Sequence, residues 1–260
     1  MAKMVTLYSG SSGNSTLISD GDTALLVDMG RSCRNTLESL YAMGVSAGDL
    51  NAILVTHEHT DHVSGLMTFL KHYDVPVFGA SKTLAYLRRN RLVPDKAELN
   101  ETDWLDGFEI GNVGVNWFET SHDSEACVGY RFTFGSGGTL GLATDLGCVS
   151  EEVFEALCGC DVVALESNYD VTKLMTGRYP YFLKNRIRST AGHLSNDECA
   201  ATAVRLAASG TSRMVLMHLS RENNEPELAL TTCLACLEDN GTELDVRVAP
   251  RYEAGEPIEV

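Results

Sequence analysis

The segment ILVTHEHTDHVSGL, from Ile53 to Leu66, constrains the fold of this 260-residue chain more than any other. It places three histidines and one aspartate within six residues, directly after an apolar run. Burying such polar groups is costly unless something pairs with them. Imidazole and carboxylate groups are ligands that suit zinc, manganese and iron. The segment therefore predicts a buried strand that ends at a metal site, with the ligands His57, His59, Asp61 and His62.

Three further residues of ligand type follow predicted strands in the same way. His122 stands in FETSHDSE, Asp145 in GLATDLG and His218 in VLMHLSREN. Ligands at the same ends of neighbouring strands converge on one edge of the fold. Because seven ligands exceed the four of a closed tetrahedral site, they predict two divalent metal ions, drawn from zinc, manganese or iron. His72, ten residues past His62, is interpreted as an ordinary helix residue.

Strand-like and helix-like segments are mixed along the chain. Short apolar runs between turn residues predict strands at 5–8, 15–18, 24–28, 49–57, 75–80, 108–110, 113–119, 128–134, 139–144, 161–167, 213–220 and 244–250. Helical spacing predicts helices at 35–44, 62–75, 81–90, 150–160, 195–210 and 225–241, with Ser81 and Ser150 as N-caps. No linker-like stretch interrupts them. The pattern predicts one α/β domain over residues 1–260, with two sheets packed face to face and helices outside.

The charge distribution separates one segment from the rest of the chain. The formal net charge of −16 argues against nonspecific binding of polyanions over the whole surface. Between Asp170 and Asp197, however, no acidic residue occurs, and five of the 20 basic residues fall within sixteen positions, interleaved with Tyr179 and Tyr181: Lys173, Arg178, Lys184, Arg186 and Arg188. Basic side chains pair with phosphates and aromatic rings stack on bases. The alternative is a solvated loop.

The N-terminal residues lack the apolar core of a signal peptide, and no run approaches the roughly 18–20 apolar residues that span a bilayer. The eight cysteines are therefore expected to be reduced thiols in a cytoplasmic protein without membrane contact. Cys158, Cys160, Cys233 and Cys236 could also be imagined as a four-thiolate zinc site. Since the last two lie in the helix-like segment PELALTTCLACLED, buried apolar cysteines are the preferred interpretation.

The histidine motif carries a resemblance to a known family. HEHTDH resembles the H-x-H-x-D-H signature of the metallo-β-lactamase superfamily, and the later His122, Asp145 and His218 follow that superfamily's order. The resemblance spans nearly the whole chain and implies the αββα sandwich with a dinuclear centre between its sheets. It implies that the first metal is held by His57, His59 and His122, the second by Asp61, His62 and His218, and that Asp145 bridges them.

Two positions narrow the expected chemistry within this superfamily. Its β-lactamases commonly have cysteine where Asp145 stands, which argues against antibiotic hydrolysis. Its redox branch usually has glutamate where His59 stands, which favours hydrolysis here. Fold alone does not choose the substrate.

Other motifs resemble nucleases of the superfamily. Glu166 in ALESNYD and His193 in TAGHLSN resemble the glutamate and histidine that work beside the metals in tRNase Z and the β-CASP group. Together with SGSSGNS and HLSRENN, these motifs most resemble the compact YycJ-like (WalJ) subfamily, which is associated with 5′-to-3′ exonuclease action on DNA. The candidate phosphate-binding residues are Ser12, Asn14, Ser15, Lys184, Arg186, Arg188, Ser220 and Arg221.

The resulting hypothesis is a DNA exonuclease that uses a hydroxide activated by two metal ions. Asp61 would hold a metal and orient the nucleophile, while His193, oriented by Glu166, would stabilise the phosphate or protonate the leaving oxygen. Two alternatives stay open: a hydrolase of small thioesters, lactones or cyclic nucleotides, and a metal-bound regulatory protein with weak catalysis. The sequence also leaves the native metal and the oligomeric state open.

Overall fold

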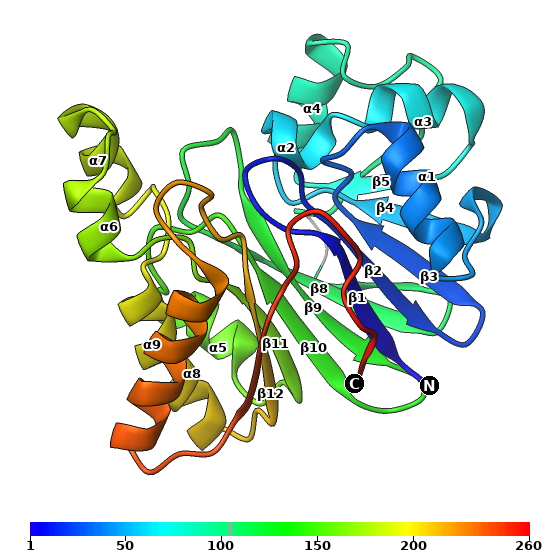
Figure 1. The fold of residues 1–260 in the computed structure, drawn as a ribbon. Coiled ribbons are helices and arrows are strands. Elements are labelled where there is room, and N and C mark those ends of the chain that lie inside the picture. Colours follow the sequence, from blue (N-terminus) through cyan, green and yellow to red (C-terminus); the bar gives the residue numbers. More distant parts are fainter. Residues whose placement is uncertain (104–105) are drawn as a thin grey trace.

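The computed structural model describes residues 1–103 and 106–260. Two mixed seven-stranded sheets pack face to face, and helices cover their outer sides (Figure 1), which confirms the predicted αββα sandwich. The first sheet has the order β14 (Ile258–Glu259), β1 (Lys3–Tyr8), β2 (Ser15–Asp20), β3 (Thr23–Val27), β4 (Leu50–Leu54), β5 (Val77–Gly79) and β6 (Leu99–Glu101). The second has the order β13 (Asp245–Val248), β12 (Arg213–Met217), β11 (Val162–Glu166), β10 (Thr139–Ala143), β9 (Val128–Phe134), β8 (Val113–Glu119) and β7 (Phe108–Ile110).

Each sheet joins an antiparallel part to a parallel part. Strands β14, β1, β2 and β3 pair antiparallel, and β3 to β6 pair parallel. In the second sheet, β7 to β10 pair antiparallel and β10 to β13 pair parallel. Side chains from both sheets fill one central core, including Leu25 and Leu54 from the first and Tyr130 and Phe132 from the second. Because helices cover the outer faces as well, neighbouring strand residues such as Leu25 and Leu26 are apolar on both faces of the sheet.

The outer faces of the two sheets each pack against their own helices (Figure 1). On the side of the first sheet lie α1 (Cys33–Ala42), the 3₁₀ turn η1 (Ala47–Asp49), α2 (Thr60–Val63), α3 (Leu66–His72) and α4 (Ser81–Arg89). The second sheet is covered by α5 (Glu151–Leu157), α8 (Asn196–Ala208) and α9 (Pro226–Asp239). Two short helices, α6 (Val171–Thr176) and α7 (Tyr181–Ile187), stand away from both sheets in Figure 1.

Several sequence-based boundaries need correction. Ser150 caps α5 as predicted, but Ser81 lies inside α4, whose N-cap is Ala80, and the Ser81 hydroxyl donates to Asp103 Oδ2 at 2.5 Å. The predicted helix at 62–75 is two helices, α2 and α3. No helix was predicted between Asp170 and Ser195, where α6 and α7 form. The short strands β6 and β14 were also missed.

The eight cysteines and His72 occupy ordinary structural positions. All eight cysteines are free. Cys160, Cys199 and Cys233 are buried in the apolar layer between the second sheet and its helices, with Cys236 packed against it. His72 is exposed at the end of α3. In the described part of the chain, no helix has both the length and the apolar character needed to cross a membrane.

Candidate metal centre

The polar ends of four strands meet at one edge of the sandwich. The segment after β4 carries His57, while His122 follows β8, Asp145 follows β10 and His218 follows β12. Asp28, Asp145 and His218 have φ angles of 60°, 57° and 55°, in the left-handed region that non-glycine residues rarely occupy. Such backbone conformations persist where the surrounding structure requires them, often at functional sites. All seven predicted ligands lie in groups that could hold a metal ion: His57, His59, Asp61, His62, His122, Asp145 and His218.

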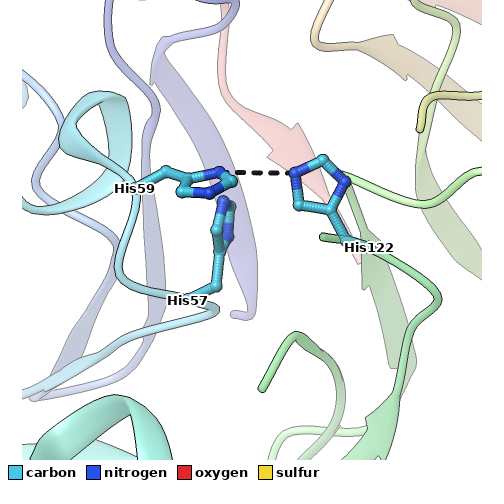
Figure 2. Close-up of side chains that lie close together, drawn as sticks. All are labelled: His57, His59 and His122. Carbon is cyan, nitrogen blue, oxygen red and sulfur yellow. Dashed lines mark hydrogen bonds between the residues drawn. The ribbon is translucent and has the colours of Figure 1, made fainter. Parts of the chain in front are cut away.

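Three histidines form the first group (Figure 2). His59 Nδ1 and His122 Nε2 point toward each other at 3.3 Å, with the His57 ring directly beside them. His122 Nδ1 donates to the carbonyl oxygen of Gly192 at 2.9 Å, which leaves its Nε2 free to act as a ligand. Two nitrogens at about 2.0–2.1 Å from one zinc ion in tetrahedral geometry are roughly 3.3 Å apart. The spacing of this pair therefore fits a shared ion.

Asp61, His62 and His218 form the second group. Asp61 Oδ2 lies 3.8 Å from His62 Nε2 and 3.6 Å from His218 Nε2. His62 and His218 are buried, whereas the Asp61 side chain retains 25% exposure. This group thus presents one carboxylate to solvent above two buried imidazoles.

Asp145 lies between the two groups. Its Oδ2 is 3.1 Å from His62 Nε2 and its Oδ1 is 3.7 Å from His122 Nε2. Three buried atoms at this centre, His57 Nε2, Asp145 Oδ2 and His218 Nε2, have no hydrogen-bond partner among residues 1–103 and 106–260. A buried polar atom left without a partner costs about 1–3 kcal/mol. The donor types and these unpaired atoms together fit divalent metal ions.

Two fully buried carboxylates hold the histidines from behind. Glu166 Oε1 accepts from His193 Nδ1 at 2.8 Å and from His218 Nδ1 at 2.7 Å, and its Oε2 accepts from the backbone N–H groups of Leu146 and Leu194, each at 3.1 Å. Because all its acceptor positions face protein groups, Glu166 acts by orienting two imidazoles. Such carboxylates fix the tautomer and direction of a metal-binding histidine.

Asp28 supports His62 in the same manner and was not predicted from the sequence. Asp28 Oδ2 lies 2.8 Å from His62 Nδ1, while the backbone and hydroxyl of Thr56 donate to the two carboxylate oxygens at 2.9 and 2.8 Å. The available signal was an aspartate at the end of the apolar run LLVD, the same pattern that drew attention to Asp145.

Burial and charge act against each other at the centre. Burial alone would raise the pKa of Glu166, but the charge of His193 and its hydrogen bond lower that pKa to about 2. Burial would lower the pKa of His218, but the charge of Asp145 and the nearby carboxylates of Asp61 and Glu166 raise it to about 10. The pKa of Asp145 falls well below its usual value because His218 and His62 outweigh its burial. Protons on histidines thus balance the carboxylates in the metal-free protein, and metal ions would replace them.

A cavity of about 310 Å³ opens above the centre. Its floor includes His59, Asp61, His122, Asp145, His193 and His218, and its walls include Ser11, Tyr179, Arg186 and Ser220. Arg186 Nε donates to Asp123 Oδ2 at 2.5 Å, so this guanidinium is anchored beside the cavity. The predicted residues Arg186, His193 and Ser220 are therefore brought to the same space as the metal-ligand groups.

Other predicted phosphate-binding residues lie elsewhere or are engaged within the protein. The Ser15 hydroxyl donates to the carbonyl oxygen of Asp28 at 2.9 Å, and Asn14 Oδ1 accepts from Gly10 N at 2.8 Å. Asn14 Nδ2 lies 2.9 Å from His62 Nε2. Ser15 and Asn14 are buried. Both are thus placed to stabilise the loop and the ligands rather than to meet a substrate.

Some basic side chains of residues 173–188 are bound within the protein, and others are exposed to solvent. Lys184 is buried and its Nζ donates to the carbonyl oxygens of Met175 and Gly177 at 2.7 and 2.8 Å, which ties α7 to the end of α6. Lys173 pairs with Glu225. Arg188 is exposed and contacts Met175 Sδ at 3.5 Å. Ser12 and Arg221 are exposed outside the cavity wall.

Comparison with known proteins places the chain in a family. Residues 23–219 match the family model described as a β-lactamase superfamily domain. The chain belongs to this superfamily. The β-lactamase superfamily thus accounts for both the sandwich and the histidine-rich edge, and the expectation of a metallo-hydrolase is confirmed.

Relatives within the superfamily cover almost the full chain. It is 35% identical to exodeoxyribonuclease YycJ of Bacillus anthracis over 239 residues, which are 90% of this chain and 89% of that protein. It is 34% identical to exodeoxyribonuclease WalJ of Streptococcus pneumoniae over 250 residues, 95% of this chain and 93% of that protein. The crystal structure of the metallo-β-lactamase fold protein YhfI from Bacillus subtilis superposes with a TM-score of 0.75 at 18% identity, covering 100% of both chains. In the described residues, the groups that could hold a metal contain no cysteine.

Proposed function

We propose that this protein is a metal-dependent nuclease that removes nucleotides from the 5′ end of DNA. The observation that carries the proposal is the cavity, where His193 and Arg186 face the same space as the histidine and aspartate groups. A hydrolase of phosphodiesters needs this combination, because it must stabilise the charge on a phosphoryl group and supply a proton to the leaving oxygen. The names of the two relatives as exodeoxyribonucleases support DNA as the substrate.

Two ions are proposed, in the two groups on either side of Asp145. His57, His59 and His122 would hold one, Asp61, His62 and His218 the other, and the Asp145 carboxylate would contact both. When bound, such a pair of divalent ions activates water at neutral pH and stabilises charge on phosphoryl oxygens. Zinc, manganese and iron all suit this ligand set.

The chain's own groups would handle the protons and the substrate. Asp61, the partly exposed carboxylate, would accept a proton from the attacking water. His193 donates from Nδ1 to Glu166, which fixes the ring and leaves Nε2 for the substrate. Burial opposes the charged form of His193, but Glu166 outweighs it and raises the pKa, so the imidazole can donate a proton to the leaving oxygen. Arg186 would neutralise a phosphate of the bound strand.

The helices α6 and α7 favour a nucleic acid over a small substrate. Tyr179 lines the cavity, and Tyr181 and Phe182 at the start of α7 are 71% and 74% exposed. Exposed rings of this kind form stacking platforms for the bases of single strands, with basic residues beside them. Arg178 and Arg188 are exposed in the same segment. Hydrolysis of a small thioester or lactone would not require this surface.

The cell location and the domain organisation are part of the same proposal. The free cysteines support a reducing compartment such as the cytoplasm. The central core shared by both sheets supports a single domain over residues 1–260.

The direct test is digestion of DNA labelled at either end, as single and double strands, with added Mn²⁺ or Zn²⁺ and an RNA of the same sequence for comparison. From a 5′ label the wild-type protein should release labelled mononucleotide at the earliest times. From a 3′ label it should give a series of progressively shorter strands. Asp61→Ala is the inactive control. If fully metallated protein cleaves no nucleic acid, then the small-substrate or regulatory alternative holds instead.

A further inference from the structure

Two arginines lie beneath the loop of residues 9–14, beside the metal centre. Arg31 Nη1 donates to the carbonyl oxygen of Ser12 at 3.1 Å, and Arg251 Nη2 donates to the carbonyl oxygen of Leu219 at 3.1 Å. Their backbone partners adjoin the cavity, since Ser11 lines it and Leu219 stands between His218 and Ser220, which also line it. Figure 1 shows the blue loop after β1 near the red segment before β14, well apart from α6 and α7.

The two guanidinium groups share one aromatic ring. Arg31 Cζ lies 5.6 Å and Arg251 Cζ 5.8 Å from the centroid of the Tyr252 ring, and Arg31 Cζ lies 5.1 Å from that of Tyr8. Neither arginine forms an ion pair with any carboxylate in the described part of the chain. In a protein with 36 acidic and 20 basic residues, two neighbouring cations without a counter-charge are unusual. Two cations gathered around one ring repel each other, and a bound anion lowers that cost.

A purely structural role does not explain these arginines well. Arg88, by contrast, donates to the carbonyl oxygens of Pro94, Asp95 and Ala97, and so closes the turn after α4. Arg31 and Arg251 each make one such bond, and the buried Nε of each has no hydrogen-bond partner among the described residues. An unpaired buried donor lowers stability. The other terminal N–H groups of both side chains form no hydrogen bond within the described part of the chain.

We propose that Arg31, Arg251 and Tyr252 form a second phosphate-binding subsite, which holds a phosphate of the nucleic-acid strand other than the one being cleaved. The guanidinium groups supply charge and forked donors that match phosphate geometry. Tyr252, 52% exposed, adds a ring on which a base or sugar can rest. This inference rests on the proposed nuclease function and assigns the strand a path along the loop of residues 9–14, on the side away from α7.

The test uses the metal-loaded protein and the variants Arg31→Gln, Arg251→Gln and Arg251→Lys. Arg213→Gln is the matched control, because Arg213 begins β12 at the end of the strand remote from His218 and is paired with Asp245. Binding of a cleavage-resistant phosphorothioate oligonucleotide is measured over a range of salt concentrations. Turnover of bis(p-nitrophenyl) phosphate, which has a single phosphate and so cannot occupy the metal centre and the subsite at once, is measured in parallel.

Each Gln variant should weaken oligonucleotide binding by about tenfold and reduce the slope of log K against log salt by about 0.7, the value for one lost contact to a single strand. Arg251→Lys should keep the salt slope while losing part of the affinity. Turnover of the small diester and binding by the control should not change. Inhibition by a deoxynucleoside monophosphate should also be unchanged, because the subsite holds a strand phosphate and not the product.

Other outcomes overturn the inference in distinguishable ways. Unchanged oligonucleotide binding and salt slope would show that the arginines are structural. Equal losses in small-diester turnover and oligonucleotide binding would place their effect at the metal centre, through Leu219 and His218. Loss of mononucleotide inhibition would assign the subsite to the product. Wild-type protein that hydrolyses the small diester but binds no oligonucleotide would overturn both this inference and the nuclease proposal.

Discussion

The floor and the rim of the cavity differ in burial, in charge and in how they are held. The floor comprises the ligands that line the cavity and His193, and the buried ligands His57 and His62 complete the two groups below it. Glu166 and Asp28 hold histidines of this region from behind. The rim is formed by α7 on one side and by Ser11 and Ser220 on the other, with the cluster of Arg31, Arg251 and Tyr252 next to that second side. Floor groups are mostly buried, whereas Tyr181 and Phe182 on the rim are largely exposed. This contrast indicates that the floor carries out hydrolysis and the rim binds the substrate. Substitutions in the floor should therefore lower turnover of every substrate, whereas substitutions in the rim should weaken DNA binding alone.

The largest effect is expected on the floor, from Asp145→Ala. Asp145 lies between both ligand groups, so its removal should cost metal content and reduce hydrolysis of DNA and of a small diester alike. The loss should exceed the about 10–100-fold that removal of an outer-shell partner causes. Metal analysis and both assays measure it. Asp245→Ala, an exposed aspartate at the start of β13, is the control and should keep full metal content.

The next effect separates a catalytic group from the ligands. His193→Ala should keep its metal and lose about 10²–10⁴-fold in turnover of both substrates, because a proton donor is removed. His72→Ala, on exposed helix surface, should behave as wild type. The structure also groups His193 with Asp145, Glu166 and His218 as potential ligands. Loss of bound metal in the His193 variant would therefore show that His193 is a metal ligand.

The two supporting carboxylates should differ from each other. Asp28→Asn affects His62 alone among the floor histidines and should lower metal affinity by about 10–100-fold, with activity restored at high metal concentration. Glu166→Gln affects both His218 and His193, so excess metal should restore metal content but not turnover. Activity measured across a metal titration distinguishes the two. Equal rescue of both variants would contradict the positioning of His193 by Glu166.

Substitutions on the rim should change DNA binding alone. Tyr181→Ala and Phe182→Ala should each weaken binding of single-stranded DNA by about 1–3 kcal/mol if each ring stacks one base. Turnover of a small diester should stay at the wild-type level. Tyr41→Ala on α1, whose side chain is 82% exposed, is the matched control. An equal fall in DNA binding and in turnover of the small diester would contradict the separate roles of rim and floor.

The floor was largely predictable from the sequence, while the rim was not. HEHTDH and the polar residues that end apolar strands identify ligands because strand ends converge whatever the details of packing. Asp28 was missed, because an aspartate after a strand is also common in turns. The helices α6 and α7 are too short to give a clear helical period. The internal bonds of Lys184 and the pairing of Arg31 with Tyr252 depend on tertiary contacts that spacing does not encode.

Metal titration with simultaneous assay of DNA cleavage tests the central claim most directly. Metal-free protein, prepared with a chelator, is reloaded with Mn²⁺ or Zn²⁺, and bound metal per chain and release of 5′-labelled mononucleotide are recorded in the same samples. The account predicts no cleavage without metal, and cleavage that rises to its maximum as two ions bind per chain. Full metal loading without cleavage of any nucleic acid, or undiminished cleavage without metal, would contradict it.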